Sequence, residues 1–246
     1  MKKKILALIP ARSGSQRLKN KNIKKINGHP LIAYSIIEAK KSKLFDDIIV
    51  STNSKKYSII AKKYGAKVPF LRPNKFSRAT SPDFQWVRYT INKLKRIGLE
   101  YDFFFILRPT NPFRTARTIK RAWCKFIINL KKADTLRAVE PCKQHPYKMW
   151  LKNKLYINPL IKKKHNGQPY YNMQTKSLPK IFIQNASLEI SKVRNLEKYK
   201  TITGKKIILF LTKKFEGLDI NYEFDLFYAK YLIKKKIVKL EAISKT

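Results

Sequence analysis

The chain has 246 residues, of which 43% are hydrophobic, and a formal net charge of +41; this length predicts one large α/β domain with at most a small addition. No apolar run approaches the roughly 18 residues of a membrane-spanning helix, and about six apolar residues after Met-Lys-Lys-Lys are too few for a secretory signal. We therefore expect a cytoplasmic protein without a membrane partner. The two cysteines, Cys124 and Cys142, have neither the spacing of a disulfide framework nor that of a metal site.

The positive charge invites a nucleic-acid interpretation, because cationic surface attracts phosphates without specificity. The lysines, however, are spread along the whole chain. Lys, Ile, Asn, Phe and Tyr are abundant together while Gly numbers only 7, a pattern that a genome rich in A and T also produces. No helix-turn-helix, zinc-finger or RNP signal is found. We expect only weak, salt-sensitive polyanion binding and no specific nucleic-acid partner.

The first element is a continuous apolar run over residues 5–9, which is typical of a strand buried on both faces of a parallel sheet. It ends at Pro10, and residues 11–23 are small, polar and basic. Open α/β sheets bind ligands beyond the carboxyl ends of their strands. Backbone N–H groups and several cations in such a loop can hold phosphates. From the residue types alone, a phosphate site and a solvated basic loop are equally good interpretations.

Alternating strands and helices follow this loop. We expect a helix over residues 31–41, a strand over 47–51, a helix capped by Ser54 that ends at Gly65, and a short strand over 68–71. This alternation predicts right-handed crossovers and a parallel sheet. Arg72-Pro73 comes next.

Residues 81–83, Ser-Pro-Asp, then have the composition of a helix start, with Ser81 as the N-cap and the helix running to about Gly98. A helix N-terminus at this edge of the sheet is a second site for an anion or a hydroxyl group. Alternatively, Thr80 and Ser81 serve only to cap this helix and contact no ligand.

The strand over residues 101–107 is apolar on both faces after Asp102 and should be central in the sheet. It leads into a loop at 108–114 that two prolines constrain. A helix from Thr115 to about Leu130 follows; its inward side chains should be Trp123, Phe126, Ile127 and Leu130. Further strands are expected over residues 134–140, 181–190 and 207–211. The loop-rich stretch between 141 and 180 is long for a connection within a domain, which is typical of a lid or an interaction arm.

The chain has only fifteen carboxylates, so a group of four near its C-terminus is informative. Asp219-Ile-Asn221 places two oxygen side chains on one side of an extended segment, and such oxygens, with phosphates and water, suit Mg²⁺. We expect Asp225 in the first turn of the last helix. Glu216 and Glu223 are best interpreted as charges at helix starts.

Ile9-Pro-Ala-Arg12-Ser-Gly-Ser, followed five residues later by Lys21-Asn22-Ile23, resembles the signature loop of the CMP-sugar cytidylyltransferases. This family includes the synthetases for acylneuraminic, legionaminic and pseudaminic acids. Further segments match in the same order and extend the resemblance over most of the chain: Arg72-Pro73 with Thr80-Ser81, residues 108–114, His145-Pro-x-Lys148, residues 181–190 and Asp219-Ile-Asn221.

The resemblance implies a three-layer α/β fold with a mostly parallel twisted sheet, like the Rossmann-like nucleotide-diphospho-sugar transferases. Residues 1–140 and 181–246 would form the nucleotidyltransferase domain, and residues 141–180 an inserted dimerisation arm. It also implies CTP and a nine-carbon acidic sugar as substrates, Mg²⁺ as cofactor and a homodimer.

The resemblance also assigns roles to residues. Catalytic roles go to Arg12, Lys21 and Asp219; nucleotide binding to Ala11, Ser15, Asn22, Arg72, Thr80 and Ser81; sugar binding to Arg108, Thr110, His145, Lys148, Gln184 and Asn185; and the metal to Asp219 and Asn221.

Three departures from the family pattern keep alternatives open. Arg108 replaces the usual Gln, Asn221 replaces a second Asp, and Tyr170 stands where sialic acid enzymes commonly have Arg. The alternatives are a nucleotidyltransferase for the eight-carbon acid Kdo or with another base, and a catalytically weakened homologue that acts as a binding module.

The interpretation of the charge is testable on the pure protein. Because the cations are dispersed, we expect elution from heparin at moderate salt. Sequence-selective binding to a DNA or RNA duplex in a mobility-shift assay would contradict it.

Overall fold

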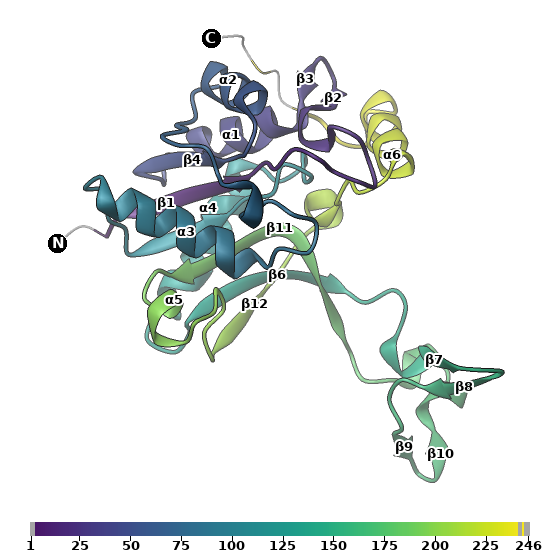
Figure 1. The fold of residues 1–246 in the computed structure, drawn as a ribbon. Helices are drawn as coiled ribbons and strands as arrows, with labels where there is room; N and C mark the ends of the chain where they lie inside the picture. Colours follow the sequence, from purple (N-terminus) through teal and green to yellow (C-terminus); the bar gives the residue numbers. More distant parts are fainter. Residues whose placement is uncertain (1–2, 241–242, 244–246) are drawn as a thin grey trace. The chain divides into compact units, whose positions relative to one another are not determined.

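The computed structural model describes residues 3–240 and 243 (Figure 1). The chain divides into two compact units, one made of residues 1–138 and 185–246 and the other of residues 139–184. The second unit corresponds to the stretch that the sequence singles out as an arm between residues 141 and 180. Each unit is described by itself below.

The first unit is built on one six-stranded sheet with the strand order β12-β6-β11-β5-β1-β4 (Figure 1). The strands are β1 (Ile5–Pro10), β4 (Asp47–Ser51), β5 (Phe103–Ile106), β6 (Thr135–Pro141), β11 (Phe182–Lys192) and β12 (Ile207–Leu211). β1 pairs in parallel with both β4 and β5, whereas β11 runs antiparallel to β5. The predicted α/β class and the central place of β5 are confirmed.

The helices of the first unit agree with most of the expected ranges. They are α1 (Leu31–Ser42), α2 (Lys55–Lys63), α3 (Asp83–Arg96), α4 (Ala116–Ile128), α5 (Asn195–Lys198) and α6 (Glu223–Lys234). The short elements of this unit are the 3-10 helices η1 (Lys21–Ile23), η2 (Asn74–Phe76) and η6 (Lys214–Gly217) and the ribbon of β2 (Lys25–Ile26) with β3 (His29–Pro30). Two predicted caps are confirmed: Ser54 accepts from the backbone N–H of Tyr57, and Thr115 forms a capping box with Thr118.

The sheet is covered on both faces, which explains why β1 is apolar at every position. Its side chains alternate between the faces because successive Cβ atoms of a strand point in opposite directions. Ile5, Ala7 and Ile9 pack in a cluster with α1, α2 and α4, whereas Leu6 and Leu8 pack with α3. Because β1 and β5 run parallel, their carboxyl ends lie at the same edge of the sheet (Figure 1).

A third cluster joins α6 to the N-terminal loop. Leu18 and Ile26 from the loop region pack with Leu226, Ala229 and Leu232 of α6. The C-terminal helix is thereby held against the beginning of the chain.

Three expectations are wrong. Residues 68–71 form no strand; only Lys67 bridges Ile49, because Pro69 has no N–H to extend a ladder. Ser81 is not the N-cap of α3, since Pro82 takes that place and the Ser81 hydroxyl donates to the carbonyl of Lys75. Ile127 does not face inward but is 39% exposed.

The second unit consists of short hairpins and turns. Its elements are η3 (Pro146–Lys148), β7 (Trp150–Asn153), β8 (Tyr156–Pro159), β9 (Lys164–His165), β10 (Gln168–Pro169), η4 (Tyr170–Asn172) and η5 (Thr175–Ser177). β7 pairs with β8, and β9 with β10, both antiparallel. Tyr147 stacks on Tyr170 with ring centroids 4.6 Å apart. The tip of the first hairpin is apolar and open, with Leu155 86% and Tyr156 72% exposed.

Within the described part of the chain, none of the helices combines the length and the apolar character that a membrane span requires.

Candidate active site

The loop after β1 is anchored at both ends by hydrogen bonds to neighbouring segments. The N–H of Ala11 donates to the carbonyl of Ser51 at 2.9 Å, and that of Ser13 to Oδ1 of Asn53 at 2.9 Å. The buried amide of Asn22 donates to the carbonyl of Arg12 at 3.0 Å. Asn22 therefore shapes the backbone of the loop. The half-buried Ser15 lies in the same loop.

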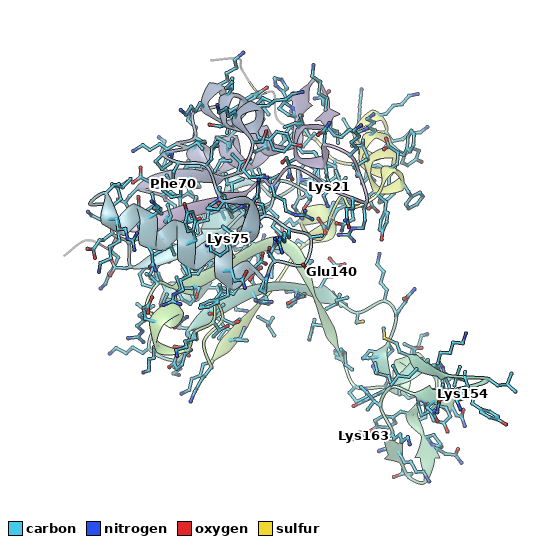
Figure 2. The ribbon with its side chains drawn as sticks, in the orientation of Figure 1. Lys21, Phe70, Lys75, Glu140, Lys154 and Lys163 are labelled. Atoms are coloured by element: carbon cyan, nitrogen blue, oxygen red, sulfur yellow. The ribbon has the colours of Figure 1, made fainter. Side chains whose placement is uncertain are left out.

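The C-terminal segment before α6 meets this loop. The N–H of Ile220 donates to the carbonyl of Thr110 in the loop after β5, at 2.9 Å. Lys21 Nζ and Arg17 Nη2 both donate to Oδ1 of Asn221, at 2.9 and 2.8 Å. Figure 2 labels Lys21 at this junction. Residues about 200 positions apart in the sequence thus form one cluster, as the sequence analysis requires.

Asp219 completes the cluster. Its Oδ2 accepts from the amide nitrogen of Asn221, so the two oxygen-bearing side chains lie on one side of the segment, as predicted. Its Oδ1 is buried, and among the described residues it has no hydrogen-bond partner. A buried carboxylate oxygen without a partner is costly unless a cation or donor is supplied. The site is therefore suited to a cation or a ligand that fills this position.

The cations of the cluster repel one another. Burial lowers the pKa of Lys21; the charge of Asp219 raises it, and Arg17 and Arg12 lower it further. Positive charges held together and partly desolvated bind an anion strongly, because the anion removes their repulsion. The electrostatics of the loop therefore favour the phosphate interpretation over a solvated basic loop.

The other acidic residues near Asp219 have structural partners. Asp225 Oδ2 accepts from the backbone N–H groups of Asn221 and Tyr222, both at 2.8 Å, at the start of α6. Glu216 binds the Arg121 guanidinium through both oxygens, at 3.0 and 2.7 Å. The expected place of Asp225 in the first turn is confirmed. In the described residues, no group of three or more His, Cys, Asp or Glu side chains is placed to hold a metal ion.

Arg72 lies buried beside the loop with an unused donor. Its Nε donates to Oγ of Ser77 at 3.1 Å, and its guanidinium lies 5.4 Å from the ring centroid of Trp86 on α3. Its Nη2 is buried and has no partner among the described residues. Burial, together with the charge of Arg12, lowers the pKa of Arg72 to about 10. The unused donor suits a ligand acceptor. Thr80, which follows Arg72 in the chain before α3, is exposed.

Arg108 is paired inside the protein. Its Nη2 donates to Oδ2 of Asp83 at 2.5 Å and to Oε1 of Glu189 at 3.1 Å, while Arg137 holds the second oxygen of Glu189 at 2.8 Å. Burial lowers the pKa of Arg108, but the two carboxylates raise it more, so it lies above its ordinary value. Its guanidinium therefore links the loop after β5 to the first turn of α3 and to β11.

Comparison with known proteins places this geometry in a family. Residues 6–81 match the family described as Cytidylyltransferase. The chain is 33% identical over 234 residues, 94% of its length, to the CMP-N,N'-diacetyllegionaminic acid synthase of Campylobacter jejuni, of which it covers 96%. It is equally similar, with the same coverage, to the post-translational flagellin modification protein B of Campylobacter coli. The chain belongs to the CMP-sugar cytidylyltransferase family.

Solved structures support the fold of the family. The CMP:2-keto-3-deoxy-manno-octonic acid synthetase complexed with CTP superposes with a TM-score of 0.70 at 15% identity, covering 95% of this chain and 99% of that one. A cytidylyltransferase from Leptospira borgpetersenii has a TM-score of 0.62 at 17% identity, covering 99% and 90%. At these identities the likeness concerns the fold alone.

The residues that the family pattern assigns to sugar binding are divided between the two units. In the first unit, the side-chain amide of Asn185 donates to Oγ1 of Thr212 at 2.9 Å, which links β11 to the end of β12. His145, Lys148 and Gln184 belong to the second unit. Both ring nitrogens of His145 are engaged there, one with the carbonyl of Pro179 and one with the N–H of Tyr147. That Asn185, His145, Lys148 and Gln184 bind the sugar stays a prediction.

Two buried residues of the family loop at 108–114 were missed from the sequence. Asn111 is 1% exposed, and neither atom of its amide has a partner among the described residues. Arg114 is fully buried and donates to the carbonyl of Ser187 and to Oγ of Ser35, and burial lowers its pKa to about 9. The signal available was their position in a motif, but their burial is a tertiary property. Asn111 is a further candidate for substrate contact.

Replacing Arg108 with Gln, the usual family residue, tests whether its ion pairs with Asp83 and Glu189 stabilise the fold. Asp83 and Glu189 would lose their shared cation, so the free energy of unfolding at pH 7 should fall by about 1–3 kcal/mol in urea denaturation. Burial raises the pKa of Asp83, but Arg108 and Trp86 lower it more, to below its ordinary value. This stabilisation is therefore present above about pH 4 and is lost as the pH falls through the folded-state pKa.

The difference between wild type and Arg108→Gln should accordingly shrink at pH 3. Arg88→Gln is the matched control, because the Arg88–Glu197 pair is exposed at 3.6 Å and contributes little. Equal stability of Arg108→Gln and wild type at pH 7 would show that the pairing is not structural.

Proposed function

We propose that this protein joins CMP from CTP to a nine-carbon acidic sugar of the nonulosonic class and releases pyrophosphate. The observation that carries the proposal is the cluster in which Lys21 and Arg17 bind Asn221 beside Asp219. It combines a basic loop with an oxygen-rich segment in a chain that is similar to relatives named for CMP-sugar synthesis over 94% and 71% of its length.

A legionaminic-type acid is the first choice among the nonulosonic sugars. The relatives named for N,N'-diacetyllegionaminic acid match over long stretches; the Legionella pneumophila synthase is 34% identical over 202 residues, 71% of this chain and 86% of that protein. A pseudaminic acid cytidylyltransferase from Campylobacter jejuni is 40% identical, but over only 129 residues, 52% of this chain and 56% of that one. Kdo and a donor with another base remain alternatives that the assay below distinguishes.

The protein's contribution to the reaction is positioning and charge neutralisation. The loop cations bind the triphosphate, with Arg12 on the α-phosphate and Lys21 on the departing pyrophosphate. The buried donor of Arg72, together with Ala11, would hold the cytosine. Because the cations are fixed before the substrate arrives, they need little reorganisation as charge develops in the transition state.

The chemical step is an in-line displacement. The oxygen of the anomeric hydroxyl attacks the α-phosphorus, the bond from that phosphorus to the pyrophosphate oxygen breaks, and the hydroxyl proton passes to water. Mg²⁺, which Asp219 and Asn221 would hold with phosphate and water oxygens completing its shell, supplies further neutralisation of phosphate charge. Oδ1 of Asp219, which has no partner among the described residues, supports the role of Asp219. Oδ1 of Asn221 accepts from Lys21 and Arg17, so Asn221 would have to exchange these donors for the ion.

We include a homodimer and a cytoplasmic location in the proposal. The exposed apolar hairpin of the second unit, with Leu151, Leu155, Tyr156 and Ile157, supports association with a second copy, because apolar patches of this kind commonly mark interfaces. The cytoplasm supplies CTP.

Pyrophosphate release tests the activity. We expect pyrophosphate release only when CTP, a divalent ion and an acidic sugar are all present. N,N'-diacetyllegionaminic acid should be preferred over sialic, pseudaminic and Kdo acids. Chelation by EDTA should abolish release, and Mg²⁺ should restore it. Release with UTP in place of CTP, or with Kdo alone, would favour the alternative substrates; no release with any acid would favour the binding-module alternative.

Lys21→Ala tests the role of the phosphate loop. Loss of one contact to the departing group should reduce kcat/KM for CTP about a hundredfold or more, equivalent to about 3 kcal/mol. Lys19→Ala is the matched control, since Lys19 is an exposed cation of the same loop and should leave kcat/KM within about threefold. Unchanged turnover in Lys21→Ala would refute the assignment.

A further inference from the structure

A cavity of about 340 Å³ opens on the outer face of α3. Its walls are Phe76 from η2 and the residues Phe84, Gln85, Arg88, Tyr89, Asn92, Lys93 and Arg96 of the helix. The opposite face of the same helix carries Trp86, Val87, Ile91 and Leu94, which are buried against the sheet. The cavity is therefore separate from the loop at 11–22 and from Arg72, Arg108 and Asp219.

Three aromatic rings form the apolar part of the wall. Phe76 and Tyr89 lie with their centroids 5.1 Å apart at an angle of 40°, and Phe70 supports Tyr89 edge-on at 5.9 Å. Figure 2 labels Phe70 and Lys75 beside α3. Phe84 provides the third ring. Rings braced in this way offer apolar faces against which another aromatic ring can pack.

Three cations line the same cavity. Arg88 has its guanidinium 5.9 Å from the Phe84 centroid and an exposed, 3.6 Å pair with Glu197. Lys93 and Arg96 have no ion pair among the described residues. Two amides, Gln85 and Asn92, supply hydrogen-bonding groups on the wall. The combination of an aromatic wall, convergent polar groups and a volume at the lower end of ligand pockets is typical of a small-molecule site.

We propose that this cavity binds an aromatic anion about the size of a nucleoside monophosphate. The ring of the ligand stacks on Phe76, Phe84 and Tyr89, and its phosphate or carboxylate pairs with Arg88, Lys93 and Arg96. Stacking on protein aromatic rings tolerates many ring systems, whereas the guanidinium groups select for an acidic group. A nucleotide and a non-nucleotide aromatic acid share this chemistry.

Calorimetric titration of the full chain at low ionic strength tests the proposal, with AMP and phenyl phosphate as probes. We expect at least one probe to bind saturably at one site. Binding of AMP alone identifies a nucleotide ligand, and binding of phenyl phosphate alone identifies a non-nucleotide aromatic acid. The absence of saturable binding by both probes overturns the proposal.

Two variants locate the bound probe. Asn92→Trp fills the cavity from an exposed position without changing a charge or the core, and the combined Arg88→Ala, Lys93→Ala and Arg96→Ala variant removes the cations. Each variant should weaken binding of the probe at least tenfold. The thermal unfolding of Asn92→Trp should match that of the wild type, which would show that the fold is intact.

The matched control removes three exposed lysines from α2, with Lys55→Ala, Lys56→Ala and Lys62→Ala combined. It lowers the net charge equally and should change affinity by less than threefold. An equal loss in both triple variants would show nonspecific attraction to the basic surface and overturn the proposal. Binding that survives Asn92→Trp but disappears in Lys21→Ala would place the probe at the candidate active site and overturn it as well. Because no step measures CTP turnover, failure here is distinct from failure of the proposed function.

Discussion

The structure around the candidate site depends on the junction between the basic loop after β1 and the segment before α6. Lys21 and Arg17 would repel each other in isolation, but both donate to Oδ1 of Asn221, next to the carboxylate of Asp219. The packing of Leu18 against α6 holds the two segments together, and the bond from Ile220 to Thr110 ties the C-terminal segment to the loop after β5. The apolar contacts thus keep an electrostatically unfavourable group of cations in place, ready for an anion.

Buried arginines form the framework behind this junction. Arg114 connects α1 to β11, and Arg108 connects the loop after β5 to α3 and β11. Such charged groups are costly to bury unless hydrogen bonds and ion pairs compensate for the lost hydration. Within the described residues, Arg72 and Arg114 each keep one buried donor that has no hydrogen-bond partner, and such a donor suits a ligand acceptor.

The sequence predicted most of the fold because the signals were local. The unbroken apolar run of β1 indicated a strand covered on both faces, and Ser54 and Thr115 indicated helix starts that the structure contains. Two local expectations were wrong. Ser81 has the residue type of an N-cap, yet its hydroxyl donates to the carbonyl of Lys75, and Pro69 has no N–H to extend the pairing beyond the bridge at Lys67.

For the candidate site, the sequence alone supplied the chemistry: cations in a loop at the end of the first strand, and two oxygen-bearing side chains near the C-terminus. Residue type and order carry that information because each group's charge and hydrogen-bonding capacity is intrinsic. Only the tertiary structure decided which groups meet and which are already satisfied. It paired Arg108 with Asp83 and Glu189 and engaged both nitrogens of His145. It left the amide of Asn111 and one oxygen of Asp219 buried, with no partner in the part of the chain that the structure describes. Burial and long-range pairing arise from the packing of segments remote in the chain, so no local pattern of residues encodes them.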